Sequence, residues 1–381
     1  MNFSLFAASA PGLEPYTAQE LRQLNLARVS AVPGGVEFRG SQRDIYRANL
    51  HLRTASRILV RLGEFYAAAF AELRKTASRL PWEQYLAPGQ PIALKVTCHK
   101  SKLYHSDAVA ERIVGAIEDR LGRRVRHLKG NDESETAPAA QLILARLDHD
   151  HCTISVDASG ELLHRRGYRL ATAKAPLRET LAAGMLLASG WDTRAPLLDP
   201  FCGSGTIAIE AALLAYGLPP GRARRFAFMD WPDYAAALWQ ALLADPEQPS
   251  THAVRPIIQA SDRDAGAIAA ARANAERAGV ADRIEFTCRA VSAIEPPAFP
   301  GWVVTNPPYG VRVSQKHDLR NLYAQLGHVL RAKCPGWRIA LLTNSVQLQK
   351  NIGIDFDGGA ALVNGGLRVR LFSGKVLRAE P

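Results

Sequence analysis

The four residues Asn306-Pro307-Pro308-Tyr309 follow an apolar run, residues 301–305, that predicts a buried strand. Open α/β sheets place ligand sites at the carboxyl ends of such strands. The side-chain carbonyl of Asn306 and the backbone carbonyl of Pro307 could each accept an N–H bond from the exocyclic amine of a nucleobase, while Tyr309 could stack on the base. Two such bonds would localise the nitrogen lone pair toward an incoming methyl group. The alternative is an ordinary strand-to-turn corner, because Asn-Pro is a common turn signal.

A glycine-containing turn upstream favours the chemical interpretation. Residues 196–198 predict a strand that ends at Asp199, Gly203 and Gly205 predict a tight turn, and the residues that follow predict a helix. A second strand ends at Asp262, whose carboxylate could accept both ribose hydroxyls of a nucleoside cofactor. A nicotinamide cofactor would need a third glycine at the start of the helix and an acid about 20 residues further on, and the sequence has neither.

Together, Asp-Pro-Phe-Cys-Gly-Ser-Gly-Thr at 199–206 and Asn-Pro-Pro-Tyr at 306–309 resemble the class I S-adenosylmethionine-dependent methyltransferases that modify exocyclic amines of bases. Over nearly the whole chain, the order of motifs also resembles the THUMP-domain methyltransferases, and within them the bacterial large-subunit rRNA guanine-N2 enzymes, with tRNA guanine-N2 enzymes as near relatives. In some bacteria the rRNA enzyme is fused to a second methyltransferase domain. Because this chain ends at Pro381, only the first activity is expected. The segments that carry this wider resemblance are 5–14, 34–38, 164–169 and 175–183.

The resemblance implies that S-adenosylmethionine is the cofactor and that Asn306, Pro307 and Tyr309 are the catalytic residues. Thr180 is a candidate near the cofactor carboxylate, although it could equally be the N-cap of the helix that follows. Relatives usually carry an Asp after the third strand to accept from the adenine amine, and Ala290 stands at that position here. Backbone groups or Ser292 are therefore expected to hold the adenine. The other implied cofactor contacts are Asp199, Phe201, Gly203, Gly205 and Asp262.

A dedicated proton acceptor is not evident in the motif, and the methylated amine is acidic enough to lose its proton to solvent or to a nearby carbonyl. His317 and Asp318 could be proposed as bases, but a loop residue and a helix N-cap are the simpler interpretations. His149 and His151 alternate with acids at an expected strand turn and lack further ligands in view. We therefore expect no metal site, and in-line methyl transfer needs none.

Composition agrees with an RNA-binding globular protein. The chain has 381 residues, 47% of them hydrophobic and 22% charged, and its net charge of +11 suggests a polyanionic partner. The five cysteines are widely separated and odd in number, which argues against a disulfide framework or a zinc site. The sequence shows neither a signal peptide nor a run of about 20 apolar residues, so a cytoplasmic monomer is expected.

Four segments are expected along the chain: a ferredoxin-like α+β domain at 1–58, a THUMP RNA-binding domain at 59–158, a linker at 159–175 and an α/β methyltransferase domain at 176–381 with a mostly parallel sheet and a reversed edge strand. In the second unit, a helix over 107–121 is expected to follow an N-cap at Ser106, and residues 129–140 are expected to form a mobile loop. The linker's basic cluster, which includes Lys174, could bind RNA or only pack. The basic residues named as RNA contacts are Lys95, Lys100, Lys102, Arg124, Arg165, Arg166 and Arg169.

Overall fold

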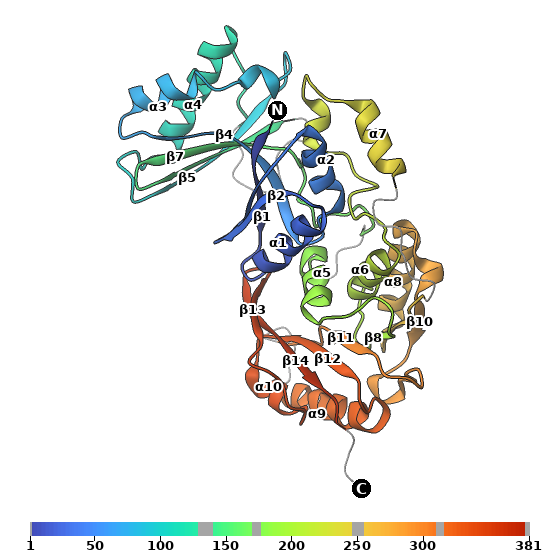
Figure 1. Cartoon of the computed structure of the whole chain (residues 1–381). Helices are drawn as coiled ribbons and strands as arrows, with labels where there is room; N and C mark the ends of the chain where they lie inside the picture. The colour runs from blue at the N-terminus through green and yellow to red at the C-terminus, as the bar shows by residue number, and fades with distance from the viewer. Residues whose placement is uncertain (1, 129–139, 170–176, 246–254, 310–315, 378–381) are drawn as a thin grey trace.

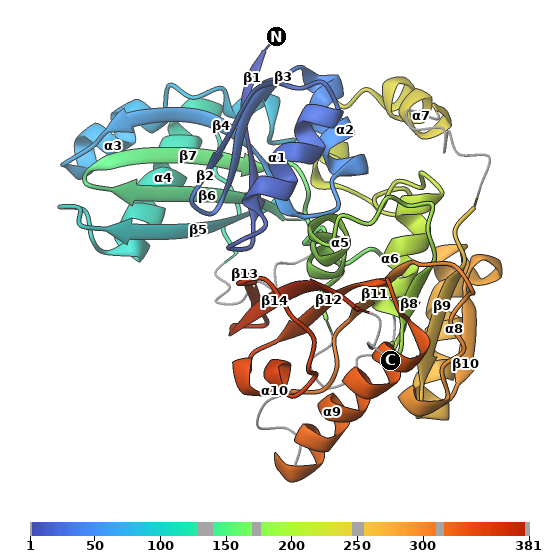
Figure 2. The same cartoon turned by 60° about the horizontal axis from the view of Figure 1, so that its bottom comes forward.

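The computed structural model describes residues 2–128, 140–169, 177–245, 255–309 and 316–377, with the side chains of 316–318 excepted. Two seven-stranded sheets organise these residues (Figures 1 and 2). One lies in residues 2–158, called the front end below, and the other in residues 177–377, called the catalytic part after the activity expected of it. Part of the expected linker, residues 170–175 with Lys174, and nearly all of the expected mobile loop lie outside the described residues.

The front-end sheet is continuous across the expected ferredoxin-like and THUMP domains. Strand β4 (Ala55–Tyr66) pairs antiparallel with β1 (Phe3–Ser9) on one side and with β7 (His151–Asp157) on the other. A boundary at 58/59 therefore falls within a single strand, and the division into two domains there stays a prediction. The strand order is β2 (Ala27–Val32), β3 (Gly35–Gly40), β1, β4, β7, β6 (Gln141–Asp148) and β5 (Ile92–His99). Among the described strands of this sheet, only β5 and β6 pair in parallel.

The front-end helices bury one apolar face each. In α4 (Ser106–Leu121), Val109, Ile113 and Ile117 recur at helical spacing and are fully buried, as the periodicity predicts. The predicted N-cap is wrong, because Ser106 is already the first helical residue and His105 precedes it without a side-chain cap. The other helices are α1 (Glu14–Gln23), α2 (Gln42–His51), α3 (Phe70–Ala77) and the short η1 (Trp82–Gln84).

The catalytic sheet has the predicted architecture. Its parallel strands are, in order across the sheet, β10 (Glu285–Cys288), β9 (Ile258–Asp262), β8 (Leu197–Asp199), β11 (Trp302–Thr305) and β12 (Arg338–Thr343). The final hairpin then adds β14 (Leu367–Lys375) antiparallel to β12, with β13 (Ala360–Asn364) at the edge.

Helices cover both faces of this sheet because successive strand residues point to opposite sides. Val304 packs in the core with α5 and α6, whereas Val303 packs in the core with α9. This alternation requires continuously apolar strands, which the sequence has. The helical elements are α5 (Glu179–Ala188), α6 (Thr206–Ala215), α8 (Ala265–Ala278), α9 (Lys316–Lys333), α10 (Val346–Lys350), η3 (Ala281–Arg283) and η4 (Val291–Ala293).

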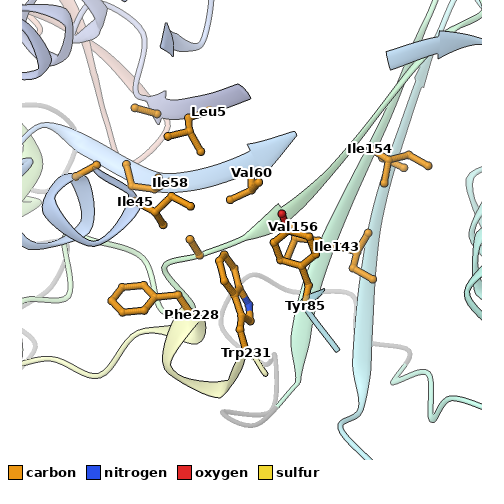
Figure 3. Close-up of a cluster of buried hydrophobic side chains, with 14 of the residues drawn as sticks. Leu5, Ile45, Ile58, Val60, Tyr85, Ile143, Ile154, Val156, Phe228 and Trp231 are labelled. Atoms are coloured by element: carbon orange, nitrogen blue, oxygen red, sulfur yellow. The ribbon is translucent and has the colours of Figure 1, made fainter. Parts of the chain in front are cut away.

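The segment between α6 and β9 packs away from the catalytic sheet, against the front end. It contains η2 (Ala227–Asp230) and α7 (Ala236–Ala244). Phe228 stacks on Tyr46 of α2 with ring centroids 4.2 Å apart, and Trp231 meets Tyr85 edge-on at 4.9 Å. Figure 3 shows both side chains among front-end core residues such as Ile45 and Val156. This segment therefore completes the front-end core.

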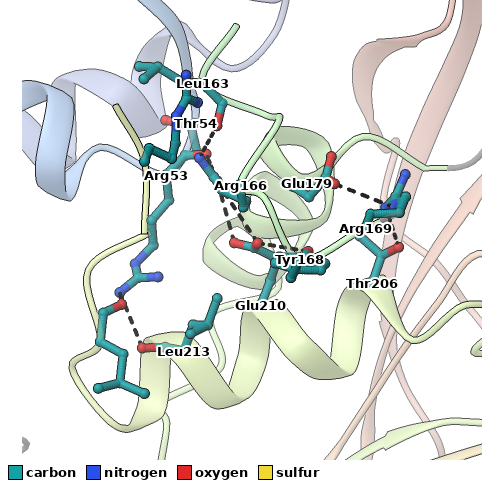
Figure 4. A network of polar contacts seen from close by, with 12 residues as sticks. Arg53, Thr54, Leu163, Arg166, Tyr168, Arg169, Glu179, Thr206, Glu210 and Leu213 are labelled. Carbon is teal, nitrogen blue, oxygen red and sulfur yellow. Dashed lines mark hydrogen bonds and ion pairs between the residues drawn. The ribbon is translucent and has the colours of Figure 1, made fainter. Parts of the chain in front are cut away.

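A buried polar network joins the front end to α6 (Figure 4). Arg166 donates to the carboxylate of Glu210 on α6 and to the carbonyl of Arg53, and Tyr168 donates to Glu210 at 3.0 Å. Arg53 in turn donates to the carbonyl of Leu213, near the carboxyl end of α6. Burial raises the pKa of Glu20, which accepts from the backbone of Arg53 at the same junction. The two parts are thus joined by paired, desolvated groups.

These contacts correct two predicted RNA contacts. Arg166 is 4% exposed and its guanidinium is occupied by Glu210 and carbonyl groups, so it cannot reach a phosphate. Arg169 donates to Thr206 Oγ1 at 2.6 Å and lies 3.5 Å from Glu179, with only a tenth of its side chain exposed. For these two arginines, packing is the interpretation that the structure supports.

Among the described helices, none combines the length and the apolar composition that crossing a bilayer requires.

Candidate active site

The carboxyl ends of β8 and β11 meet at Asp199 and Thr305. The two strands are parallel neighbours in register, and Thr305 Oγ1 donates to Asp199 Oδ1 at 2.7 Å. The same oxygen accepts the backbone N–H of Phe201 at 3.2 Å. Burial, together with the smaller effect of the nearby Asp262 charge, raises the pKa of Asp199 to about 7, although the hydrogen bonds from Thr305 and Phe201 act to lower it. No pattern in the sequence singles out Thr305, although it directly precedes the Asn-Pro-Pro-Tyr motif.

The turn between β8 and α6 depends on glycine. Gly203 and Gly205 have φ of +50° and +83°, a region that side chains disfavour. A Cβ on Gly205 would lie 3.0 Å from Cβ of Ala271, so the turn packs tightly on α8. The turn is also fixed by the backbone N–H of Cys202, which donates to Ser261 O, and by Asn274 Nδ2, which donates to Ser204 O. Gly205 is the N-cap of α6, so this turn leads directly into a helix N-terminus, which is a common place for anionic ligand groups.

Asp262 lies at the end of β9, beside this turn. Its Oδ2 accepts the Gly203 N–H at 3.0 Å, and its Oδ1 accepts the Asp264 N–H at 3.0 Å. Each carboxylate oxygen can accept a further bond, so the ribose hydroxyls of a nucleoside remain possible partners.

The Asn306 side chain presents an unused acceptor at the end of β11. Its Oδ1 is buried and has no hydrogen-bond partner among the described residues. The residues after it are held in place: Pro308 O accepts from Tyr323 Oη at 3.4 Å, and Tyr309 Oη accepts from Asn364 Nδ2 at 3.0 Å. A buried acceptor without a partner costs about 1–3 kcal/mol, so a ligand donor is the natural partner for it.

The site fits a nucleoside cofactor next to an amine substrate. The carboxylates of Asp199 and Asp262 and the tightly packed Gly205 turn lie on one side of β11. The Asn306 Oδ1 acceptor, which has no partner among the described residues, lies at the end of this strand. Phe201 is partly buried and packs on the α9 side of the sheet. Thr180 is buried in the first turn of α5, whose N-cap is Arg178, so the alternative that Thr180 is the N-cap is wrong.

The expected adenine contacts lie after β10. Ala290 precedes the short η4, and Ser292 is exposed within it. The carbonyl of Ser292 accepts from Lys333 Nζ at 3.1 Å. The side chains of His317 and Asp318 lie outside the described residues, and α9 begins at Lys316, ahead of both.

The remaining predicted RNA contacts are exposed. Arg165 lies 3.9 Å from Glu161 in a solvent-exposed ion pair. Lys95 on edge strand β5, Lys100, Lys102 and Arg124 lie on the surface of the front end. Their roles stay predictions.

One histidine cluster differs from the sequence-based expectation. His99 Nδ1 and His149 Nδ1 lie 2.9 and 2.8 Å from the same oxygen of Asp148, and Arg146 donates to the other oxygen. These contacts hold the pKa of Asp148 down to about 2. The three potential ligand atoms lie within 4.8 Å of one another, although His151, which the sequence also suggested, is not among them.

Comparison with known proteins agrees with this geometry. Residues 4–59 match the RlmL ferredoxin-like domain, residues 67–157 the THUMP domain, and residues 166–361 the RMKL-like methyltransferase domain. The chain is 38% identical to ribosomal RNA large subunit methyltransferase K/L of Syntrophotalea carbinolica over 97% of its own length and 53% of that protein. It thus spans about half the length of such curated relatives.

Two further relatives match over nearly their whole length. A Synechocystis protein that is provisionally named an RNA methyltransferase is 35% identical and is covered to 94%, with 95% of this chain aligned. A crystal structure of a provisionally named methyltransferase, complexed with SAH, is 30% identical with a TM-score of 0.86 and covers 100% of this chain and 99% of its own. The chain therefore belongs to the S-adenosylmethionine-dependent THUMP-domain methyltransferases with an RMKL-like catalytic domain.

Proposed function

We propose that the chain transfers a methyl group from S-adenosylmethionine to the N2 amine of a guanosine in 23S rRNA. The observation that carries the proposal is the buried Asn306 Oδ1, an acceptor without a partner at the tip of β11. It supports recognition of an N–H donor at that point, and the guanine N2 amine is such a donor. Similarity to proteins named for the ribosomal large subunit supports rRNA as the substrate.

The chain's own residues would act by positioning and polarisation. Asn306 Oδ1 and the Pro307 carbonyl accept the two amine hydrogens, which turns the nitrogen lone pair toward the donor. Tyr309 flanks the base, and its hydroxyl is fixed by Asn364. Bound S-adenosylmethionine supplies an electrophilic methyl group on a sulfonium.

Cofactor binding would use the other strand ends. Asp262 accepts the ribose hydroxyls, and the Gly203–Gly205 turn lets the backbone approach the ligand. Asp199 supplies negative charge near the methionine end. Thr180, Phe201 and Ser292 remain proposed contacts of the carboxylate and adenine ends. After transfer, the nitrogen carries a positive charge and releases its proton to water.

The front end would bind the RNA. Lys95, Lys100, Lys102, Arg124 and Arg165 are exposed and can contact phosphates without reading sequence. A ribosomal substrate agrees with the cytoplasmic location expected from the sequence.

The test is incubation of the purified chain with labelled S-adenosylmethionine and 23S rRNA from cells that lack the gene, followed by nucleoside analysis. N2-methylguanosine is the expected product. N6-methyladenosine would instead identify an adenine methyltransferase, and labelling of tRNA alone would identify a tRNA enzyme. Tight RNA binding without any methylated nucleoside would identify a non-catalytic assembly factor.

A further inference from the structure

A pocket of about 560 Å³ lies between the front end and the last hairpin of the catalytic sheet. Its walls are the Pro11–Gly12 turn, the end of β12, the start of α10 and both strands of the β13–β14 hairpin. The front-end wall touches the hairpin directly, because a Cβ on Gly12 would lie 2.1 Å from the carbonyl oxygen of Ala361. Figures 1 and 2 show β13 next to the start of α1. None of the proposed cofactor contacts is among the residues that line this pocket.

The pocket adjoins the Asn-Pro-Pro-Tyr motif through two hydroxyl contacts. Tyr323 Oη lies 3.4 Å from both Pro308 O and Thr343 Oγ1, and Thr343 lines the pocket. On the other side, Tyr309 Oη accepts from Asn364, which follows the lining residue Val363. The pocket is thus linked through Tyr323 and Asn364 to the motif that is proposed to hold the target base.

The charge of the pocket is positive. Thr343 pairs with Arg370, and Val363 pairs with Arg368, so both arginines share the sheet face on which Thr343 contacts α9. Arg370 donates to Gly358 O at 3.1 Å, whereas Arg368 is exposed and has no hydrogen-bond or ion-pair partner among the described residues. No lining residue is acidic. An anion is thus attracted without competition from a carboxylate in the wall.

The rest of the wall suits a flat heterocycle. Val346 offers apolar surface and is 48% exposed, and Asn344 adds an amide that can donate and accept. The volume lies within the range of pockets that hold small ligands and exceeds what a single phosphate needs.

We propose that this pocket holds the nucleotide next to the methylated guanosine, with its phosphate on Arg368 and its base against Val346. The inference rests on the proposed function, because it assigns a second nucleotide of the same RNA strand. It predicts that the enzyme distinguishes substrates by the identity or flexibility of that neighbour.

The test compares Arg368→Gln with Arg194→Gln, which removes an exposed arginine before β8, at the opposite end of the sheet. The probe is 23S rRNA transcribed with 4-thiouridine, used for methylation kinetics, binding at several salt concentrations and photocrosslinking. Arg368→Gln should raise the KM for RNA about tenfold and lower the salt slope of binding by about 0.7, as expected for one lost single-strand phosphate contact. The affinity for S-adenosylhomocysteine should not change, and Arg194→Gln should match the wild type.

A second variant, Val346→Trp, fills the pocket from an exposed position at the start of α10 and should also raise KM. Crosslinks of the wild type should map to residues 343–346 or 361–370. If the wild type methylates RNA but Arg368→Gln and Val346→Trp behave like Arg194→Gln, the pocket assignment is overturned while the proposed function stands. If the wild type methylates no RNA, the proposed function fails, and the nucleotide site falls with it unless crosslinks and the Arg368→Gln salt effect still place RNA in the pocket.

Discussion

Among single residues, Asn306 offers a test that distinguishes a loss of methyl transfer from a loss of cofactor binding. In the proposed mechanism Asn306→Ala removes a hydrogen bond to the reacting amine, and loss of one such preorganised contact typically lowers kcat by about 100- to 1000-fold. Cofactor affinity should stay at the wild-type value, because the Asp199 and Asp262 contacts are intact. Single-turnover methylation and calorimetry with S-adenosylhomocysteine measure the two effects. Asn351→Ala, at an exposed position after α10, is the matched control. Full activity in Asn306→Ala would contradict the assigned contact.

Asp199 predicts a pH dependence of cofactor affinity. Its pKa is raised to about 7 by burial, so the carboxyl is largely neutral at pH 6 and ionised at pH 8. The ionised form attracts the sulfonium cation, and affinity for S-adenosylmethionine should therefore rise as the pH passes through about 7. S-adenosylhomocysteine, which lacks the sulfonium charge, should vary less.

Calorimetry between pH 6 and pH 8.5 measures this effect. Asp199→Asn should bind more weakly and show no rise around pH 7. An equal pH response in Asp199→Asn would assign the titration to another group.

Among the secondary-structure elements, the turn before α6 requires glycine at position 205 both for its backbone conformation and for its packing on α8. Gly205→Ala meets both a positive φ and a contact 3.0 Å from Ala271, so we expect a loss of about 1–2 kcal/mol in stability together with weaker cofactor binding. Gly190→Ala is the control, since Gly190 has φ of +70° but open space around it. The temperature of thermal unfolding should fall in both variants, whereas cofactor affinity should fall only in Gly205→Ala. Unchanged affinity in Gly205→Ala would show that the turn does not approach the ligand.

The catalytic strands and helices could be predicted from sequence because each carries a local pattern. Apolar runs end in Asp199, Asp262 and Asn306, and the structure brings these three strand ends to one edge of the sheet. Arg166 had no such pattern. An arginine in a basic segment has the same local sequence whether it meets water or, as here, Glu210 on a later helix. Only the tertiary structure distinguishes the two cases.

At the scale of the whole molecule, the segment between α6 and β9 makes the front end dependent on the catalytic part. Trp239 of α7 is buried against Phe226 and Phe228, with ring centroids 5.6 and 5.5 Å away. Trp239→Ala should lower the free energy of unfolding by about 3–5 kcal/mol. Hydrogen exchange should rise in α2 and β4 of the front end, although the substitution lies in another part of the chain. Urea denaturation and exchange mass spectrometry measure both effects.

Leu243→Ala provides the control on the same helix, because Leu243 is 39% exposed. It should change stability by less than about 0.5 kcal/mol. If hydrogen exchange in Trp239→Ala became faster only in α7, the segment would not contribute to the stability of the front end. The place where this segment packs could not be predicted from the sequence, because its aromatic residues pair with Tyr46 and Tyr85, which lie far away along the chain.

The twelve-residue strand β4 is bonded along one edge to β1 and along the other to β7, so among the described residues no hinge separates the two halves of this sheet. Rotating one half against the other would break rows of main-chain bonds rather than bend a loop. Because Arg166 also ties Arg53 of the front end to Glu210 on α6, the proposed RNA contacts keep a set distance from the proposed methyl-transfer site. The RNA has to provide the movement that brings a guanosine across that distance, so a helix that melts or an unpaired loop should be modified more readily than a rigid duplex.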